Sequence, residues 1–331
     1  MSVTANLTIK EPQPKRYRNQ RIAVIVPCHN EELTVRPVVE GFREALPEAE
    51  VYIFNNLSTD KTMEVARQVG AQVRDVNLKG KGNVVRRMFA DVDADVYVMV
   101  DGDATYHAPS ARALIDLLLD GQLDMVVGAR VESDPGPGLA YRPGHRLGNK
   151  LLTGSVQKIF GGSFRDMLSG YRVFSRRYVK SFPAHSQGFE IETELNVHAL
   201  ELRMPCAEMD TPYGARPEGS ASKLSTYRDG WRILKTIGRL VVSEKPMQFF
   251  GWLGALLALV AVVLAAPIIA EYAQTGLVRR FPTLGLVTAL MVTGGLSFVT
   301  GLILHAITLA RREAKQFAYL AAASSAGQEC R

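Results

Sequence analysis

Two long uncharged apolar runs near the C-terminal end constrain the fold of this chain more than any other feature. Residues 247–270 and 281–310 contain no Asp, Glu, Lys or Arg. A helix needs about 20 apolar residues to cross the hydrocarbon core of a bilayer. A buried core helix of this length without a charge would be unusual, so both runs are predicted to be transmembrane helices.

The charges that flank the two runs predict which side of the membrane holds the rest of the chain. Cations near the membrane favour the cytosolic side and anionic lipid headgroups. Two spans return the chain to its starting side, so an integral membrane protein with both termini in the cytosol is expected, in a bacterial inner membrane. Arg279 and Arg280 in the connecting loop run against this orientation. The supporting cations precede the first run or follow the second: Arg228, Arg232, Lys235, Arg239, Lys245, Arg311, Arg312 and Lys315.

Three further features narrow the class of protein. Cys28, Cys206 and Cys330 are widely spaced, which indicates reduced thiols in a cytosolic domain and no disulfide framework. The formal net charge is +6, but the basic residues form no tract with interleaved aromatics, so nucleic-acid binding is not expected. Residues 1–20 lack an apolar signal core and are predicted to be a disordered basic tail.

Between the tail and the spans, short apolar runs alternate with helical patterns. This alternation predicts a doubly wound α/β sheet. The expected strands are 21–27, 51–56, 72–76, 95–100 and 124–128, and the expected helices include 32–46, 82–92 and 109–119.

Past residue 130 this rhythm breaks. We expect a loop at 134–144, an amphipathic helix at 149–160 and a Pro/Gly/Ser-rich loop at 210–222. Residues 228–246 are predicted to form an amphipathic helix at the membrane interface, although a core-packing helix gives the same pattern. The expected division is an α/β domain at 21–227, this helix, two spans within 247–310 and a cytosolic tail at 311–331.

Polar clusters follow three of the predicted strands: Pro27 to Glu31, Asn55 to Asp60, and Asp101-Gly102-Asp103. Ligands of open α/β sheets bind at the carboxyl ends of the strands. Two carboxylates separated by one glycine can turn toward a single point, and Mg²⁺ or Mn²⁺ commonly joins such carboxylates to substrate phosphates. A solvated turn that caps a strand would also explain the Asp101-Gly102-Asp103 sequence.

Taken together and in this order, the clusters resemble the family 2 glycosyltransferases of GT-A fold. Further segments resemble the polyprenyl-phosphate branch of that family, which includes the dolichyl-phosphate mannose synthases. The resemblance covers roughly residues 20–245 and implies a GT-A (Rossmann-like) nucleotide-sugar-binding domain. The segments that carry it are 79–83, 128–130, Arg146 with Asn149, 166–172, and 216–224.

The resemblance also implies an activity. It is inverting transfer of one sugar from a UDP- or GDP-linked donor to a polyprenyl phosphate, undecaprenyl or dolichyl, at the cytosolic membrane face. Asp101 and Asp103 would bind Mg²⁺ or Mn²⁺ on the donor diphosphate. Arg130 and Arg146 would bind the acceptor phosphate, for which the guanidinium fork is suited.

The other site residues implied by the resemblance fall into three groups. Asn149 and Lys223 would join the arginines at the acceptor phosphate. Asp166, Ser169, Glu190 and Glu192 would contact the sugar, although the two glutamates also fit a solvated helix start. The donor contacts would be Pro27, Asn30, Glu31, Asn55, Asn56, Ser58, Asp60, Lys81, Gly82, Asp101 and Gly102.

Two departures from the family pattern leave points open. Asn55-Asn56 stands where relatives often have an Asp pair, so the preferred base is open. Thr105 stands where a Gln is common, so water or another side chain is expected to complete the metal site.

Alternative functions and the oligomeric state also stay open. The alternatives are a membrane glycosyltransferase with another acceptor (a lipid headgroup or a growing polysaccharide) and a non-catalytic sugar-nucleotide-binding protein. The Q-x-x-R-W segment typical of processive synthases is absent from the sequence. Gly294, Gly295 and Gly301 in the second run would permit close helix packing, including in a homo-oligomer.

Overall fold

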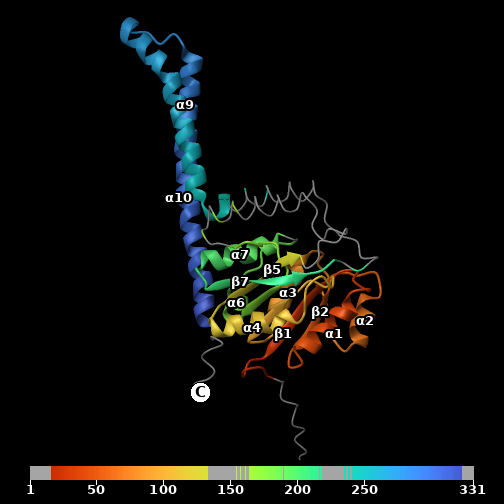
Figure 1. Ribbon diagram of the computed structural model, residues 1–331. Helices are drawn as coiled ribbons and strands as arrows, with labels where there is room; N and C mark the ends of the chain where they lie inside the picture. The colour runs from red at the N-terminus through yellow and green to blue at the C-terminus, as the bar shows by residue number, and fades with distance from the viewer. Residues whose placement is uncertain are drawn as a thin grey trace, which may run out of the picture.

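The protein combines an α/β domain with two long helices that extend away from it side by side (Figure 1). The computed structural model describes residues 16–132, 164–188, 190–215 and 241–322, together with residues 154, 157, 161, 217, 235 and 238. The expected loop at 134–144 lies outside these residues. So do all but residues 154 and 157 of the helix expected at 149–160, and residues 228–234, 236, 237, 239 and 240 of the helix expected at 228–246.

Within the described residues the domain is built on a seven-stranded sheet of order β3-β2-β1-β4-β6-β5-β7. Strands β3, β2, β1 and β4 are parallel to one another, β6 is antiparallel to both β4 and β5, and β7 is parallel to β5. The strands are β1 (Ile22–Cys28), β2 (Glu50–Asn55), β3 (Gln72–Asp75), β4 (Val96–Met99), β5 (Met125–Glu132), β6 (Arg172–Ser175) and β7 (Cys206–Tyr213).

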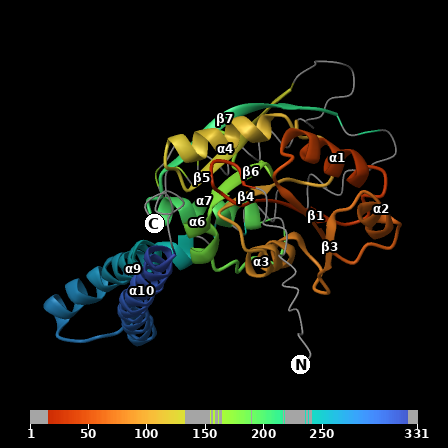
Figure 2. The same ribbon diagram turned by 90° about the horizontal axis from the view of Figure 1, so that it is seen from below.

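Helices cover both faces of the sheet, which confirms the predicted doubly wound architecture. Side chains alternate between the faces of a strand, so Val24 of β1 packs with α1, α2 and α4, while Ile25 packs with α3, α6 and α7. Figure 2 shows the two helix layers on either side of the strands. The helices are α1 (Val35–Ala45), α2 (Thr62–Gln68), α3 (Lys81–Asp91), α4 (Ser110–Asp120), α6 (Arg176–Ser181) and α7 (Ile191–Glu201).

The two apolar runs form α9 (Pro246–Thr275) and α10 (Phe281–Ala321). Only 17% of the most apolar 18-residue window of each helix is buried, so neither is the core helix of a soluble domain. Their length and composition suit transmembrane helices, which confirms the predicted fold class. They pack closely at Gly254 and Gly294, where a Cβ on Gly254 would lie 2.8 Å from the Gly294 carbonyl oxygen. A Cβ on Gly301 would lie 3.1 Å from the Phe250 Cβ, so two of the three predicted glycines, Gly294 and Gly301, serve packing within the chain.

The element boundaries differ from the expected ones at both ends of the chain. Tyr17 and Gln20 form a β-bridge, and the Tyr17 hydroxyl donates to Asp116, so the folded domain begins before residue 21. At the other end, α10 does not stop at residue 310 but continues to Ala321 beside the domain (Figure 1). The loop expected from 210 also starts later, because β7 runs to Tyr213.

Candidate active site

Three neighbouring parallel strands bring the predicted polar clusters to one edge of the sheet. Strand β1 pairs with β2 on one side and with β4 on the other. In register, Cys28 lies beside Asn55, and Met99 lies beside Ile25. The segments 27–31, 55–60 and 101–103 therefore all leave the sheet at the carboxyl edge, where α/β proteins bind ligands.

The Asp101-Gly102-Asp103 turn is held from several sides. Asp103 is 5% exposed and accepts hydrogen bonds from the Thr105 amide and hydroxyl, the latter at 2.6 Å. The Thr34 hydroxyl donates to the Gly102 carbonyl at 2.7 Å. A Cβ on Gly102 would lie 2.6 Å from the Cys28 sulfur, so only glycine fits here. Thr105 thus orients Asp103 at the position where relatives often carry a Gln.

The turn fits a divalent cation whose coordination shell is completed by substrate. Within the part of the chain that the structure describes, no group of three or more His, Cys, Asp or Glu forms a closed metal cage. Mg²⁺ commonly binds one or two carboxylates and takes its remaining oxygens from phosphates and water. Asp101 is partly exposed, with 26% of its side-chain surface accessible, so the donor set here matches that mode.

A buried ion-pair cluster connects Asp101 to two helices. The Lys81 ammonium, at the start of α3, lies 2.5 Å from Asp101 Oδ1 and 2.6 Å from Glu192 Oε1 in the first turn of α7. Burial opposes the charge on Lys81, but the attraction of Asp101 and Glu192 outweighs it and raises the pKa of Lys81. Burial raises the pKa of Glu192, and this exceeds the opposing effect of Lys81. Lys81 therefore stays charged and fixes both carboxylates.

Asn56 positions the loop that leads to Lys81. Its amide nitrogen donates to the carbonyls of Leu78 (2.7 Å) and Val76 (3.2 Å), and its amide oxygen accepts from the Gly80 amide at 2.7 Å. An Asp could not donate to either carbonyl. These contacts explain why an amide stands at this position, and they use both ends of it in the loop.

Asn55 contacts a carboxylate on the next strand. Its amide nitrogen donates to Asp75 Oδ1 at 2.8 Å, and its oxygen accepts from the Ser58 amide at 3.0 Å. An Asp at position 55 would repel Asp75 at this distance. Asp75, the last residue of β3, therefore supplies a carboxylate beside Asn55.

The remaining residues of the first two clusters join the loops after β1 and β2. Asn30 has a left-handed φ of 53°, and its side chain accepts from the Thr59 amide at 2.8 Å while its own amide donates to the Ser58 hydroxyl. Asp60 accepts from the Glu32 and Thr62 amides. Burial acts to raise the pKa of Asp60, but these hydrogen bonds prevail and lower it.

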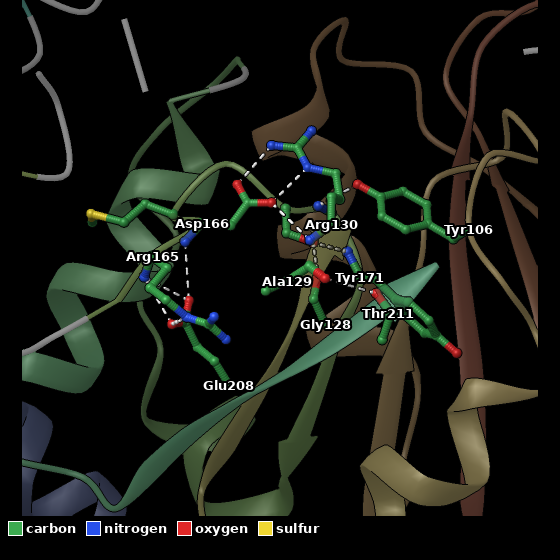
Figure 3. Close-up of polar contacts among 12 residues, drawn as sticks. Tyr106, Gly128, Ala129, Arg130, Arg165, Asp166, Tyr171, Glu208 and Thr211 are labelled. Carbon is green, nitrogen blue, oxygen red and sulfur yellow. Dashed lines mark hydrogen bonds and ion pairs between the residues drawn. The ribbon is translucent and has the colours of Figure 1, made fainter. Parts of the chain in front are cut away.

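A second group of residues forms the side of the site nearer β5 and β7 (Figure 3). Arg130, near the end of β5, makes a bidentate pair with Asp166: Nε and Nη2 each lie 2.7 Å from a carboxylate oxygen. Burial acts to raise the pKa of Asp166, and the hydrogen bond and charge of Arg130 lower it overall. Asp166, predicted as a sugar contact, thus orients the arginine predicted for the acceptor phosphate.

The segment 166–170 connects the Arg130–Asp166 pair to the Asp101 turn. Its start is held by the Glu208 carboxylate, which accepts from the Arg165 and Asp166 amides (Figure 3). The Ser169 hydroxyl is fully buried and donates to the Gly128 carbonyl at 2.6 Å, which ties it to backbone. A Cβ on Gly170 would overlap the Asp101 carboxylate. The close approach of the two halves of the site therefore depends on Gly170.

Arg172 and Asn196 brace this segment from inside the core, and sequence reasoning gave neither a role. Arg172 is fully buried and donates to the carbonyls of Ser169 (2.9 Å) and Met167 (2.6 Å) and to Asn196 Oδ1 (3.0 Å). Burial lowers the pKa of Arg172. The available signal was an arginine at the start of a short apolar run, where a buried charge needs a structural reason.

Some predicted residues are peripheral or lie outside the described part of the chain. Arg146, Asn149 and Lys223 belong to the undescribed residues. Glu190 precedes α7 at its N-cap position. Gly82 donates to the Gln187 carbonyl, and a Cβ there would overlap the backbone of Ser186, so it serves close packing of α3.

The chain is similar to several known proteins. Residues 23–182 match the family described as glycosyl transferase family 2. Protein RfbJ of Shigella flexneri is 55% identical over 130 residues, which are 39% of this chain and 99% of that protein. Glycosyltransferase AglJ of Haloferax volcanii is 35% identical over 234 residues, 70% of this chain and 76% of that protein. A dolichyl-phosphate hexose transferase of the same organism is 27% identical over 231 residues, 69% and 97% of the two chains.

Among solved structures, glucosyl-3-phosphoglycerate synthase from Mycobacterium tuberculosis shares the fold. In its complex with Mn²⁺, UDP and glucosyl-3-phosphoglycerate, the TM-score is 0.53 at 22% identity, over 68% of this chain and 80% of that chain. The order of the motifs, their common sheet edge and these relatives agree: the chain belongs to the family 2 glycosyltransferases and has the GT-A fold.

Proposed function

We propose that this chain transfers a single sugar, with inversion, from a UDP- or GDP-linked donor to a polyprenyl phosphate at the cytosolic face of a bacterial inner membrane. One observation carries the proposal: an Asp101–Asp103 edge site lies on the same chain as two membrane-length helices. A relative named as a dolichyl-phosphate hexose transferase adds support. The tail of a lipid-linked acceptor stays in the bilayer, so helices that anchor the enzyme in the membrane keep it close to this acceptor.

The chemistry requires one bond to form and one to break. An oxygen of the acceptor phosphate attacks the anomeric carbon, and the bond from that carbon to the donor diphosphate breaks. A phosphate monoester is largely ionised at neutral pH, since its second pKa is near 6, so no protein base is needed. The protein's task is to position both substrates and to stabilise the departing diphosphate.

Named residues divide these tasks. Asp101 and Asp103 would hold Mg²⁺ or Mn²⁺, which supplies positive charge to the leaving diphosphate. Mn²⁺ with UDP in the M. tuberculosis structure supports a divalent ion in this fold. Lys81 keeps Asp101 in place. Arg130, oriented by Asp166, presents its guanidinium to the acceptor phosphate, together with Arg146, Asn149 and Lys223 as the resemblance implies.

Transfer of labelled sugar into lipid tests the proposal. Protein purified in detergent is supplied with polyprenyl phosphate, Mg²⁺ or Mn²⁺ and a panel of labelled UDP- and GDP-sugars, and label is followed into the organic phase. We expect one donor to label the lipid in a metal-dependent way. Asp103→Ala should abolish the label, while the matched control Glu64→Ala, at an exposed position of α2, should retain it.

The outcomes separate the alternatives. If the label appears in a lipid headgroup or a polymer, that molecule is the acceptor and polyprenyl phosphate is not. Nucleotide binding without any transfer would favour a sugar-nucleotide-binding protein and refute the proposal.

A further inference from the structure

The last turns of α10 leave the apolar span and run beside the α/β domain. Residues 281–310 are uncharged, whereas 311–321 read RREAKQFAYLA. Figures 1 and 2 agree that this end of α10 lies along the domain next to α6. We call residues 311–321 the docking segment.

The first contact of the docking segment neutralises a buried carboxylate. Glu201 ends α7, and only 1% of its side chain is exposed. Lys315 Nζ lies 2.7 Å from one of its oxygens, and Arg312 Nε lies 3.5 Å from the other. A buried carboxylate is costly unless cations pair with it. Both of these cations come from α10.

The second contact lies one helical turn further on. The Tyr319 hydroxyl donates at 2.7 Å to Oδ2 of Asp124, which is fully buried, while the Ser175 hydroxyl donates to Oδ1 at 2.6 Å. The Arg177 guanidinium lies 4.9 Å from the centre of the Tyr319 ring. Tyr319 also packs against the core cluster of α3, α6 and α7. The domain therefore reserves a specific place for this side chain.

A third contact fixes the membrane end of the segment. Arg311 donates to the Ser243 carbonyl at 3.3 Å and lies 3.2 Å from Glu244 Oε1. Thr308, one turn earlier, donates to the same Ser243 carbonyl at 3.0 Å. The contacts thus occur at three levels from residue 308 to residue 319, and the distance from 311 to 319 is about 12 Å along a helix.

The positions of these contacts along α10 define how the sheet is oriented relative to the apolar span. Asp124 immediately precedes β5, and Ser175 ends β6, which runs antiparallel to β5. Tyr319, the contact furthest from the apolar span, therefore reaches the amino edge of the parallel strands. The candidate active site occupies the opposite, carboxyl edge. The far end of α10 thus meets the end of the sheet opposite to the described residues of the candidate active site, and the site end faces the apolar span.

We propose that the docking segment is a rigid strut that holds the catalytic edge toward the bilayer, so that the site meets the phosphate of a membrane-embedded acceptor. The choice of acceptor rests on the proposed function; the docking itself does not. Without the strut, the domain keeps its site residues but loses its fixed orientation. Transfer to a lipid acceptor then depends on occasional correct approaches.

Comparing transfer to a membrane-embedded acceptor with transfer to a water-soluble one distinguishes a positioning role of the docking segment from a purely structural role. Lys315→Glu places a carboxylate against Glu201. Glu313→Lys is the control, because it makes a charge change of the same size on the exposed side of α10. For Lys315→Glu we expect transfer to long-chain polyprenyl phosphate in liposomes to fall at least about tenfold. Transfer to a short, water-soluble prenyl phosphate should stay within about twofold of wild type. Glu313→Lys should leave both unchanged.

Hydrogen exchange tests the docking without reference to activity. A short helix end that is released into water frays, so the amides of 312–321 should be protected in wild type and in Glu313→Lys and should exchange much faster in Lys315→Glu. Equal loss toward both acceptors, no loss toward either, or unprotected amides in wild type would each overturn the strut. If wild type uses neither acceptor, the proposed function fails, and exchange alone decides the docking.

Discussion

Replacing Lys81 by Met removes the cation that Asp101 and Glu192 share. Lys81 Nζ lies within 2.6 Å of an oxygen from each carboxylate, and its side chain is 8% exposed. Removing one partner of a buried ion pair costs about 3–5 kcal/mol, because the remaining charge is left uncompensated. Asp101 keeps some access to water, so we expect a loss of about 3 kcal/mol in the free energy of unfolding.

A double-mutant cycle with Glu192→Gln measures how much of this loss comes from the pair. The double variant removes the cation and one of the two carboxylates together. Its destabilisation should therefore be about 1–2 kcal/mol smaller than the sum of the two single losses, within the range measured for residues in contact. Denaturant unfolding of the detergent-purified protein supplies the four free energies. Additive single losses would refute the shared-cation reasoning.

The pH dependence of the same variant provides an independent check. Burial raises the pKa of Glu192 above its ordinary value of 4.5, and Lys81 opposes that rise. When the pKa of a carboxyl group is higher in the folded than in the unfolded protein, its protonated form stabilises the folded protein at low pH. This contribution is lost as the pH rises through the folded-state pKa. Without Lys81 the rise is larger. Lys81→Met should therefore cost less stability at pH 5 than at pH 8, and an equal cost at both would contradict the assignment.

Three further substitutions test the site. Asn56→Asp should cost about 1–3 kcal/mol, because it leaves the buried Val76 carbonyl and the partly buried Leu78 carbonyl without this donor; it should also raise the KM for the donor sugar nucleotide, and thermal unfolding with donor titration checks both. Gly170→Ala should lower kcat by at least about tenfold while the domain still folds, since the new methyl group displaces the Asp101 carboxylate; an unchanged requirement for metal in activity titrations would refute this. Asp166→Asn should raise the KM for the acceptor more than the KM for the donor, because Arg130 loses its bidentate partner, and initial rates against each substrate decide it.

Much of the fold could be predicted from the sequence because the relevant signals are local. Runs such as 22–28 and 96–99 are apolar because both faces of a parallel strand are covered. Membrane-length helices can be predicted equally well, since the surrounding lipid requires their side chains to be apolar. Strand β6 escaped prediction: it is four residues long, begins with a buried arginine and pairs antiparallel with strands far away in the chain.

The sequence by itself determined which residues gather at the catalytic edge, because parallel strands deliver their carboxyl ends to one place. Only the tertiary structure decided what those residues do to one another. Lys81 and Glu192 are 111 positions apart, yet they share one ion-pair cluster with Asp101. Likewise, the sequence predicts a cytosolic tail after the second span, and only folding brings Lys315 and Tyr319 to buried carboxylates. Such contacts join distant parts of the chain, and no periodicity or spacing encodes them.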